Sequence, residues 1–544
     1  MSNYGTFSET FTGDIEHTVG AQELIGFLGD SRSYRHFPAT VSIIQTHASI
    51  VAVASPYVYK IKKNVNLGFL DYSALEARRF YSEREVELNS RLAHDIYLGI
   101  TPIIRSPKNG QLMFSETGES VEYAVTMRQI PDDALLKNRL AKKRVTRADM
   151  VIIGRLLGEF YRSQNPDRHI SLFGTPENIR FSVEENFEQT KCFVATAISS
   201  AAYKAIRAYN DRFFETRTHV LERRVAEGRI RECHGDLHLE HIAFMPDGVK
   251  IFDCIEFNDR FRCIDIACDT AFLIMDLEFH RHFDLAKAFA ETIADETNDR
   301  DEDVLNFYKC YRAYVRGKVS ALRSVSAALP DNERRLSLSV AKKYFRLATH
   351  YALSQSRPMA IFVMGKPASG KSSLAQHIVA ETGWKYCSSD ITRKELAGVH
   401  LFERGSAAER KALYSKSMTE RVYAAMEKDL TACGKTGRQI VIDATFGRKD
   451  LRARFIDAAR RAKMECLFIV AGVSEAETME RLKRREHSSH TVSDARIEDY
   501  QAIAAAYEEP DELSAEQKIE AVCSGSQREL CGNVLADIAR RSII

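Results

Sequence analysis

The 544-residue sequence predicts an α/β multidomain protein, and three observations lead to this expectation. Short strand-like runs with polar turns fill residues 41–62, helical periodicity dominates the region up to about residue 356, and an apolar run at 360–364 leads into a glycine-rich loop. The first two indicate an α+β fold, in which a small antiparallel sheet lobe precedes a helical lobe. The third indicates a separate domain with a parallel sheet. We therefore expect three segments, 1–130, 131–356 and 357–544.

Composition narrows the class of protein. The chain has 77 Lys plus Arg against 75 Asp plus Glu, a balance that argues against a nucleic-acid coat protein or a polybasic membrane binder. Its 11 Cys show no repeated Cys-x-x-Cys pair and fit reduced thiols in a cytoplasmic protein. The polar stretch Met1–Asp14 lacks the apolar core of a secretory signal, and the sequence has no apolar run long enough to span a bilayer. We expect a soluble cytoplasmic protein.

The first segment offers a lysine and a glutamate that could act on a nucleotide. After a short helix at 21–28, strands are expected at 41–45, 50–54 and 57–62. Lys60 and Lys62 fall on one face of the third strand, where a lysine can pair with phosphates, and we favour Lys60. The alternative is an edge strand that lysines keep soluble.

The helix expected at 72–92 supplies acidic partners for that lysine. Glu85 is favoured over Glu83 and Glu87, because Leu88 and Leu92 share its helical face. Each of these glutamates could equally be a solvated surface charge. A further strand is expected at 121–127.

Residues 231–257 place two aspartates around a predicted hairpin. Asp236 lies in a polar loop, strands at 242–245 and 249–252 flank a Pro-Asp-Gly turn, and Asp253 follows the second strand. Phosphoryl transfer uses such a pair, one carboxylate toward the acceptor hydroxyl and one toward Mg²⁺. The alternative is a polar hairpin whose aspartates cap and turn the chain.

His234-Gly235-Asp236 and Ile251-Phe252-Asp253 together resemble the catalytic and metal-binding segments of aminoglycoside phosphotransferases and choline kinases, which share the protein-kinase-like fold. The resemblance implies that Asp236 is the catalytic base and Asp253 a metal ligand. It also implies that Asp265 braces the catalytic loop, although a helix N-cap is an equal alternative. His241 stands where that family carries an asparagine for the second metal, and imidazole is a poor partner for Mg²⁺.

The third segment contains a P-loop pattern in the required order of strand, loop and helix. Its backbone N–H groups can cradle phosphates, Lys371 can neutralise the β and γ phosphates, and Ser372 can offer its hydroxyl to Mg²⁺. ATP and Mg²⁺ are therefore the expected cofactors. The expected nucleotide contacts are Gly365, Lys366, Pro367, Ala368, Ser369, Gly370, Lys371, Ser372 and Ser373.

Other residues of this segment are candidates for the remaining roles. The stretch 439–445 supplies a strand that ends in Asp443, which could hold Mg²⁺. Asp390 follows a strand at 385–387 and could activate an acceptor hydroxyl that Arg393 steadies, or it could cap a helix. Arg481 and Arg485 match a lid that closes over the phosphates, or they belong to a basic solvated face.

Residues 358–544 resemble gluconate-kinase-like and polynucleotide-kinase-like P-loop kinases. From about Leu24 to Pro510, the chain is identified as a member of a bacterial family that fuses an aminoglycoside-phosphotransferase-like domain to such an ATP-binding domain. The local signatures include Gly68-Phe69-Leu70-Asp71, Glu232–Asp236 and Ile442-Asp443-Ala444-Thr445-Phe446.

Three functions follow as hypotheses. The first is an enzyme with two kinase sites, each of which transfers the γ phosphate of ATP to a hydroxyl of a small-molecule acceptor. In the second, the N-terminal half is a pseudokinase-like module that binds a ligand and regulates the P-loop kinase. In the third, the acceptor is the 5′-hydroxyl of RNA or DNA. Its phosphates would be tracked by Arg393, Lys394, Arg481, Lys483, Arg484 and Arg485.

Overall fold

The computed structural model describes residues 19–68, 70–327, 329–354, 357–403, 406–486, 492 and 496–542, without the side chains of 407, 485, 486 and 499. The polar stretch Met1–Asp14 lies outside these residues. The chain forms two compact units, Met1–Ile179 with Val220–Asp301, and Arg180–His219 with Glu302–Ile544. The two units group helices by their packing. They do not test the three segment boundaries predicted from the sequence, which therefore stay predictions. Within the described residues, every helix is too short or too polar to cross a membrane.

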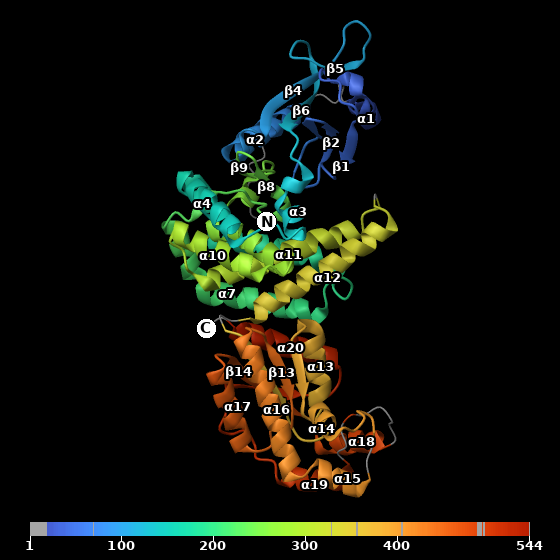
Figure 1. Cartoon of the computed structure of the whole chain (residues 1–544), viewed down its shortest axis with the longest axis vertical. Coiled ribbons are helices and arrows are strands. Elements are labelled where there is room, and N and C mark those ends of the chain that lie inside the picture. The colour runs from blue at the N-terminus through green and yellow to red at the C-terminus, as the bar shows by residue number, and fades with distance from the viewer. Residues whose placement is uncertain are drawn as a thin grey trace, which may run out of the picture. The chain divides into compact units, whose positions relative to one another are not determined.

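The first unit begins with a six-stranded antiparallel sheet in the order β1-β2-β3-β6-β4-β5 (Figure 1). Helix α1 (Ala21–Gly29) packs on one face of this sheet and α2 (Leu75–Ala93) on the other. Alternation along one strand explains this, because Ala124 faces the α1 side and Val125 the α2 side. The strands are β1 Ser42–Gln45, β2 Ser49–Ala54, β3 Tyr57–Lys62, β4 Tyr97–Arg105, β5 Leu112–Phe114 and β6 Ser120–Arg128.

Helices and two small ribbons complete the first unit. Strand β7 pairs with β10, and β8 pairs with β9 as the predicted hairpin around a Pro-Asp-Gly turn. Helix α4 packs against α10, and α9 is buried on all sides over most of its length. Their bounds are α3 Leu136–Ala141, α4 Arg147–Ser163, α5 Arg168–Leu172, β7 Ile230–Glu232, β8 Ile242–Met245, β9 Gly248–Ile251, α8 Asp259–Arg262, β10 Cys263–Asp265, α9 Ile266–Phe279 and α10 Phe283–Thr297.

The second unit contains long helices that precede the P-loop domain in sequence. The antiparallel pair α11 (Glu302–Ser324) and α12 (Asp331–Leu353) packs along its length (Figure 1). Phe307 of α11 stacks on Phe213, with ring centroids 3.9 Å apart. The helical periodicity expected through 183–208 is divided between α6 (Pro176–Thr190) and α7 (Ser200–Ala226).

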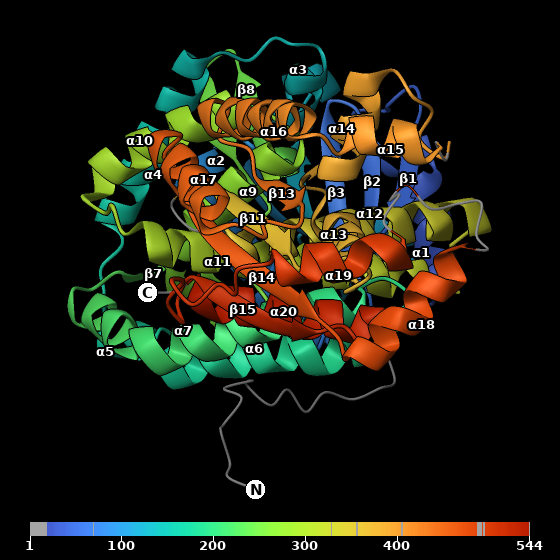
Figure 2. The same ribbon diagram turned by 90° about the horizontal axis from the view of Figure 1, so that it is seen from below.

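A five-stranded parallel sheet forms the rest of the second unit, in the order β12-β13-β11-β14-β15. Helices α13 and α20 pack together on one face, and α16 and α17 on the other (Figure 2). The predicted parallel-sheet domain is confirmed. The bounds are β11 Met359–Met364, α13 Lys371–Thr382, β12 Lys385–Ser388, α14 Ser389–Ala397, α15 Ala407–Leu413, α16 Lys416–Lys435, β13 Ile440–Asp443, α17 Lys449–Arg461, β14 Glu465–Gly472, α18 Glu475–Glu486, α19 Ile497–Ala505, β15 Lys518–Val522 and α20 Gln527–Arg541.

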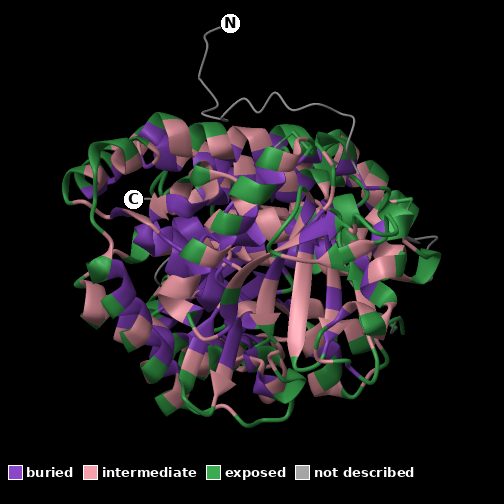
Figure 3. Cartoon of the chain, turned by 90° about the horizontal axis from the view of Figure 1, so that it is seen from above, coloured by how far each residue is buried: buried purple, intermediate pink, exposed green. Residues whose placement is uncertain are grey.

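Burial follows the amphipathic pattern of these elements. Strand β11 is buried at every position, as expected for a central strand that helices cover on both faces. The helices bury one side and expose the other, which appears as purple and green alternating along the ribbons in Figure 3. Phe362 of β11 packs against Phe455 of α17 in the core between the sheet and that helix.

A buried arginine joins two loops of the P-loop domain. Arg452 of α17 is fully buried, and its Nη1 donates to the carbonyl oxygens of Phe446 and Glu508, each at 2.9 Å. Its Nη2 donates to Oε2 of Glu512 at 2.9 Å. This guanidinium therefore fixes the chain after β13 against the chain before β15.

Replacing Arg452 by Met should lower the free energy of unfolding of this domain by about 3 kcal/mol, because Glu512 and two carbonyls would lose their buried partner. Urea unfolding followed by the fluorescence of Trp384, the only tryptophan of the chain, measures this. Arg460→Met is the control. Arg460 is exposed and pairs with Asp457, so its loss should change stability by less than about 0.5 kcal/mol. Equal midpoints for the two variants would contradict the role given to Arg452.

Candidate functional site

Two lysines of β3 share one buried carboxylate. Glu85 of α2 is fully buried, with Oε1 2.8 Å from Nζ of Lys60 and Oε2 2.8 Å from Nζ of Lys62. Lys62 also pairs with Glu256, which accepts a hydrogen bond from the hydroxyl of Tyr72 at 2.7 Å. The alternation of side chains along β3 places both lysines on the α2 side of the sheet. The contact predicted between Lys60 and Glu85 is therefore present.

Lys60 reaches a second carboxylate, that of Asp253, at 2.8 Å from Oδ1. Burial acts to lower the pKa of Lys60, but Asp253 and Glu85 together raise it well above its ordinary value. For Asp253, burial acts to raise the pKa, and Lys60 and His241 hold it below its ordinary value. Both groups are therefore charged at neutral pH.

The backbone of Asp253 is held in an unusual conformation. Its φ of 62° lies in the left-handed region, which aspartate tolerates better than most residues. The N–H of Asp253 donates to the hydroxyl of Tyr97 at 3.1 Å, and the next N–H, of Cys254, donates to Oδ1 of Asn89 at 2.8 Å. These bonds turn the chain after β9 so that the Asp253 carboxylate faces Lys60. Backbone conformations of this kind are concentrated at functional sites.

A different aspartate from the one predicted braces the loop before Asp236. The N–H groups of His234 and Gly235 donate to the fully buried Asp269, at 3.0 and 2.9 Å. Asp265, which the resemblance assigned to this role, caps α9 through the N–H of Ala267 and pairs with Arg224. The reason is position: Asp265 precedes α9, whereas Asp269 lies one turn inside it. The N-cap alternative for Asp265 is confirmed.

Gly235 is required by the shape of this loop. Its φ is +85°, and a Cβ atom there would lie 2.6 Å from the carbonyl oxygen of Phe261. The loop therefore packs directly on the backbone of α8, and Asp236 follows at its exit with a third of its side chain exposed.

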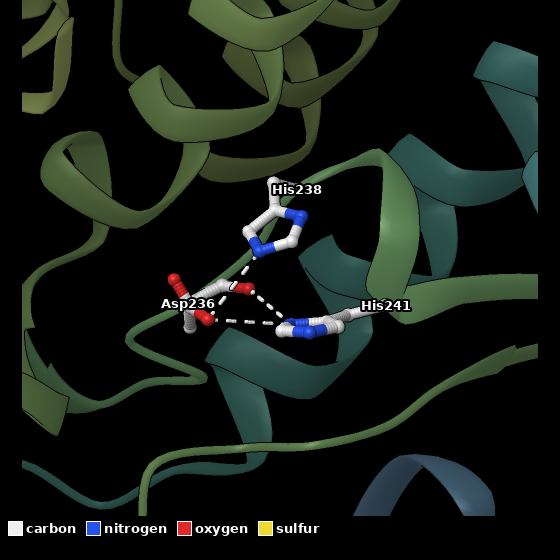
Figure 4. Close-up of side chains that lie close together, drawn as sticks. All are labelled: Asp236, His238 and His241. Carbon is white, nitrogen blue, oxygen red and sulfur yellow. Dashed lines mark hydrogen bonds and ion pairs between the residues drawn. The ribbon is translucent and has the colours of Figure 1, made fainter. Parts of the chain in front are cut away.

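The hydrogen bonds of two histidines fix their tautomers. Nδ1 of His234 accepts from the N–H of Asp236 at 3.3 Å, and Nε2 donates to the carbonyl of Phe252 at 2.9 Å. Nδ1 of His238 accepts from the N–H of Glu240 at 3.3 Å, so its proton lies on Nε2, 3.4 Å from Oδ2 of Asp236 (Figure 4). His238 therefore orients the carboxylate of Asp236.

His241 bridges the two aspartates. Its Nδ1 donates to the carbonyl oxygen of Asp236 at 2.9 Å, and its Nε2 lies 3.4 Å from Oδ2 of Asp253. Burial and the neighbouring His238 lower the pKa of His241 to about 4, so the ring is neutral at neutral pH. Asp236, His238 and His241 bring ligand-type atoms within 4.8 Å of one another, a spacing that could hold a metal ion.

The P-loop of the second unit follows β11 and ends where α13 begins at Lys371. A Cβ atom at Gly365 would collide with the carbonyl oxygen of Ala471, and one at Gly370 would lie 2.7 Å from Cβ of Cys523. Ala368, at the tip of the loop, has a φ of +60°. This conformation brings the loop's backbone N–H groups to the N-terminus of α13, an arrangement that suits phosphate. Pro367 lies in the loop, Ser372 and Ser373 lie in the first turn of α13, and Lys366 points its Nζ to Glu509 at 2.9 Å. Their contacts with a nucleotide stay predictions.

Asp443 lies beside the start of the P-loop, because β13 and β11 pair in parallel with Asp443 opposite Val363. Burial raises the pKa of Asp443 above its ordinary value, while the Lys371 ammonium and the nearby Ser372 hydroxyl act against that rise. Tyr386 donates to Oδ2 at 2.9 Å, and Oδ1 is buried with no hydrogen-bond partner. A hydroxyl and a carboxylate with a spare oxygen are the donors that Mg²⁺ prefers, so these residues fit that ion.

The other predicted residues of the second unit have different surroundings: one lies near Asp443, and two are buried against backbone carbonyls. Asp390 lies in the first turn of α14, close enough to raise the pKa of Asp443. Arg393 is buried and donates to the carbonyl of Leu413 at 2.9 Å, so it does not face an acceptor as predicted. Lys394 is likewise buried and donates to two backbone carbonyls. The expected basic groove thus lacks two of its members, because both cations stabilise loops.

Of the two arginines predicted for the lid, the structure describes the side chain of one. Arg481 donates to the P-loop carbonyl of Ala368 at 3.3 Å and to the carbonyl of Cys523, and it pairs with Glu477. It therefore lies against the P-loop. The side chain of Arg485 lies outside the described part of the structure.

Sequence reasoning missed four residues that hold the two sites: Asn89, Tyr97, Asp269 and Tyr386. Only Asp269 carried a usable signal, since it lies one helical turn after Asp265 and has the same side chain. The others act through single hydrogen bonds between distant segments, which no local pattern reveals.

Residues 361–510, which include the P-loop and Asp443, match the family model described as an AAA domain. This supports the predicted P-loop domain. Uncharacterized protein Rv2004c of Mycobacterium tuberculosis is 29% identical over 415 residues, which cover 76% of this chain and 80% of that protein. A gluconokinase from Sinorhizobium meliloti covers 34% of this chain and 94% of its own (18% identity, TM-score 0.25). A choline kinase from Cryptosporidium parvum covers 61% of this chain and 94% of its own (11% identity, TM-score 0.37).

Replacing Glu85 by Gln should lower the local stability of β3 and α2 by about 3 kcal/mol, because two buried lysines would lose their shared carboxylate. Hydrogen exchange of the amides in these elements, read by mass spectrometry, gives this free energy. Glu83→Gln on the same helix is the control. Glu83 is half exposed and pairs with Arg79, so replacing it should change the local stability of these elements by less than about 0.5 kcal/mol. Unchanged exchange in Glu85→Gln would contradict the buried pairing.

Proposed function

We propose that this chain is an ATP-dependent phosphotransferase with two sites, each of which transfers the γ phosphate of ATP to a hydroxyl. The observation that carries the proposal is the convergence of Lys371, Ser372 and Asp443 at the mouth of a P-loop between parallel strands. This arrangement supplies backbone donors, a fixed cation and oxygen ligands at one point. The arrangement of Lys60, Glu85, Asp236 and Asp253 extends the proposal to the first unit.

In the P-loop site, the chain's own groups would bind and neutralise the phosphates. The N–H groups at the start of α13 would hold phosphate oxygens, and Lys371 would offset charge on the β and γ phosphates. Ser372 and Asp443 would hold Mg²⁺, which supplies further charge neutralisation when bound. Asp390, at the carboxyl edge of the sheet, would accept or orient the acceptor's proton.

In the first unit, Glu85 would hold Lys60 toward the nucleotide phosphates, and Asp236 would accept the proton of the acceptor hydroxyl. Asp253 would hold a divalent cation. The Lys60–Asp253 ion pair, 2.8 Å long, supports this assignment, because a phosphate and a cation would each replace one partner of that pair. His238 would keep the Asp236 carboxylate in one orientation.

A small molecule is the better-supported acceptor class. A nucleic-acid 5′ end would need a basic groove, and Arg393 and Lys394 are buried against backbone carbonyls instead. Arg484 is exposed and pairs with Glu480, which leaves its charge partly neutralised. Salt-sensitive binding of an oligonucleotide would point to the other class.

A second candidate function is a P-loop kinase that the first unit regulates without turnover of its own. One observation favours it: His241 occupies the position at which the first unit would use an oxygen ligand for a second Mg²⁺. Metal-dependent turnover at the first site separates the two functions, and a missing nucleotide site there would exclude the first.

Calorimetric titration of a non-hydrolysable ATP analogue with Mg²⁺ and Mn²⁺ should show two sites in the full chain. Lys371→Ala should remove one site and Asp253→Ala the other, because each removes a charge that holds the triphosphate or its cation. Lys342→Ala, an exposed lysine of α12, is the control and should keep both. A single site that only Lys371→Ala removes would overturn the two-site proposal in favour of a regulatory first unit.

Asp236→Asn should lower turnover at the first site by roughly 10²–10⁴-fold and leave its nucleotide affinity within about threefold, because a general base acts on the acceptor's proton and not on ATP. ATP hydrolysis in a Lys371→Ala background, with water in place of the acceptor, measures the change. Nucleotide affinity that falls together with turnover would indicate that Asp236 binds the nucleotide instead.

A further inference from the structure

We propose that the cation position between His241 and Asp253 is built for a first-row transition ion of the Mn²⁺ class and not for Mg²⁺. This inference rests on the proposed nucleotide site of the first unit and names its metal. The ligands would be Nε2 of His241 and Oδ2 of Asp253, with phosphate oxygens and water to complete the shell.

The spacing of the two atoms suits a shared cation. Nε2 of His241 and Oδ2 of Asp253 are 3.4 Å apart. Two ligands that each lie about 2.1 Å from one ion, at angles between octahedral and tetrahedral, are separated by roughly 3.0–3.4 Å. The observed separation therefore lies at the upper end of the range expected for two ligands of one ion.

The tautomer of His241 directs a lone pair toward Asp253. A backbone carbonyl can only accept, so Nδ1 must carry the proton that it donates to the oxygen of Asp236 at 2.9 Å. Nε2 is then the acceptor nitrogen. Histidines that bind metals almost always donate their other ring N–H to a carbonyl or carboxylate in this way.

A hydrogen bond from Lys60 orients the carboxylate of Asp253. Oδ1 is bonded to Lys60 at 2.8 Å, which leaves Oδ2 toward His241. The side chain of Asp253 is 42% exposed and that of His241 14%. The pair therefore opens to solvent, where phosphate oxygens and water can enter.

His238 belongs near this site but not among its ligands. It lies with Asp236 and His241 in one cluster (Figure 4), yet its Nδ1 accepts from the N–H of Glu240. Nε2 then carries a proton and lies 3.4 Å from Oδ2 of Asp236. The ligand pair is therefore His241 with Asp253, and His238 positions the base.

The chemistry of the donors decides which ion is preferred. Mg²⁺ takes oxygen ligands and gives up water reluctantly, whereas imidazole binds Mn²⁺, Co²⁺ and Zn²⁺ well. In the second unit, Ser372 and Asp443 offer oxygen alone. One chain would thus carry two nucleotide sites of opposite metal preference, and the first would need a transition ion to bind its nucleotide tightly.

Pulsed electron paramagnetic resonance of Mn²⁺ bound to the full chain tests this directly. The probe is Mn²⁺ with an ATP analogue that has a methylene bridge between the β and γ phosphates, so that no nitrogen adjoins them. We expect ¹⁴N modulation from a coordinated imidazole in the wild type and its loss in His241→Asn. His238→Asn should keep the modulation, and His219→Asn, an exposed histidine of α7, is the neutral control.

Competition with Mg²⁺ gives the second measurement. In Lys371→Ala, the Mg²⁺ concentration that displaces half of the Mn²⁺ should fall at least about tenfold on His241→Asn. Absence of ¹⁴N modulation in the wild type, or an unchanged displacement concentration, would overturn the metal assignment while leaving the phosphotransferase proposal intact. Modulation without any nucleotide binding in the first unit would support the metal site and overturn the kinase function proposed for that unit.

Discussion

The first unit depends on one buried carboxylate. Glu85 neutralises two lysines of β3, and each lysine reaches onward to a residue of the segment after β9, Lys60 to Asp253 and Lys62 to Glu256. The sheet, helix α2 and the segment after β9 are thus joined by alternating charges, which are buried at Glu85 and Lys62 and reach solvent at Asp253. Buried charges are tolerated only when they are paired, so each group keeps its neighbour ionised. In the proposed function, a phosphate would take the place of Asp253 beside Lys60, and a cation would take the place of Lys60 beside Asp253.

The two candidate sites are assembled in different ways. The P-loop site is formed by one continuous loop, a helix N-terminus and a neighbouring strand, and its shape is enforced by the close approach of Gly365 and Gly370 to adjacent chain. The first site is assembled from separate segments that single hydrogen bonds hold in place. Asp269 fixes the loop before Asp236, and Tyr97 fixes the backbone of Asp253. The positions of the residues in the first site therefore depend on the packing of the whole unit. The positions of those in the second site are set by the P-loop and the chain next to it.

This difference explains what the sequence could and could not predict. The P-loop, the hairpin after Asp236 and most strands have local signatures, and the parallel sheet was expected. Strand β4 was missed because Gly99 and Pro102 interrupt its pattern. The helical spacing through 183–208 hides a break, where Ala195 adopts a φ of +71°. Asp265 was assigned the bracing role that Asp269 fills, because position in the chain does not reveal which side of a helix faces a loop. Arg393 was expected at a substrate edge, but burial depends on tertiary packing.

His241 can be regarded either as the loss of a metal ligand or as its replacement, and the contacts favour replacement. A degraded site is expected to leave unmatched carboxylates or a polar group without a partner. Here Nδ1 bonds the backbone of Asp236, whereas Nε2 and Oδ2 of Asp253 are both acceptors that face each other across 3.4 Å, as two ligands of one cation would. The ring therefore lies between the proposed base and the proposed metal ligand. Because the neutral ring adds a lone pair and no charge, the local charge of the site is unchanged while the donor becomes nitrogen. In the proposed site, a change of this kind would alter which cation is held without dismantling the surrounding pairs.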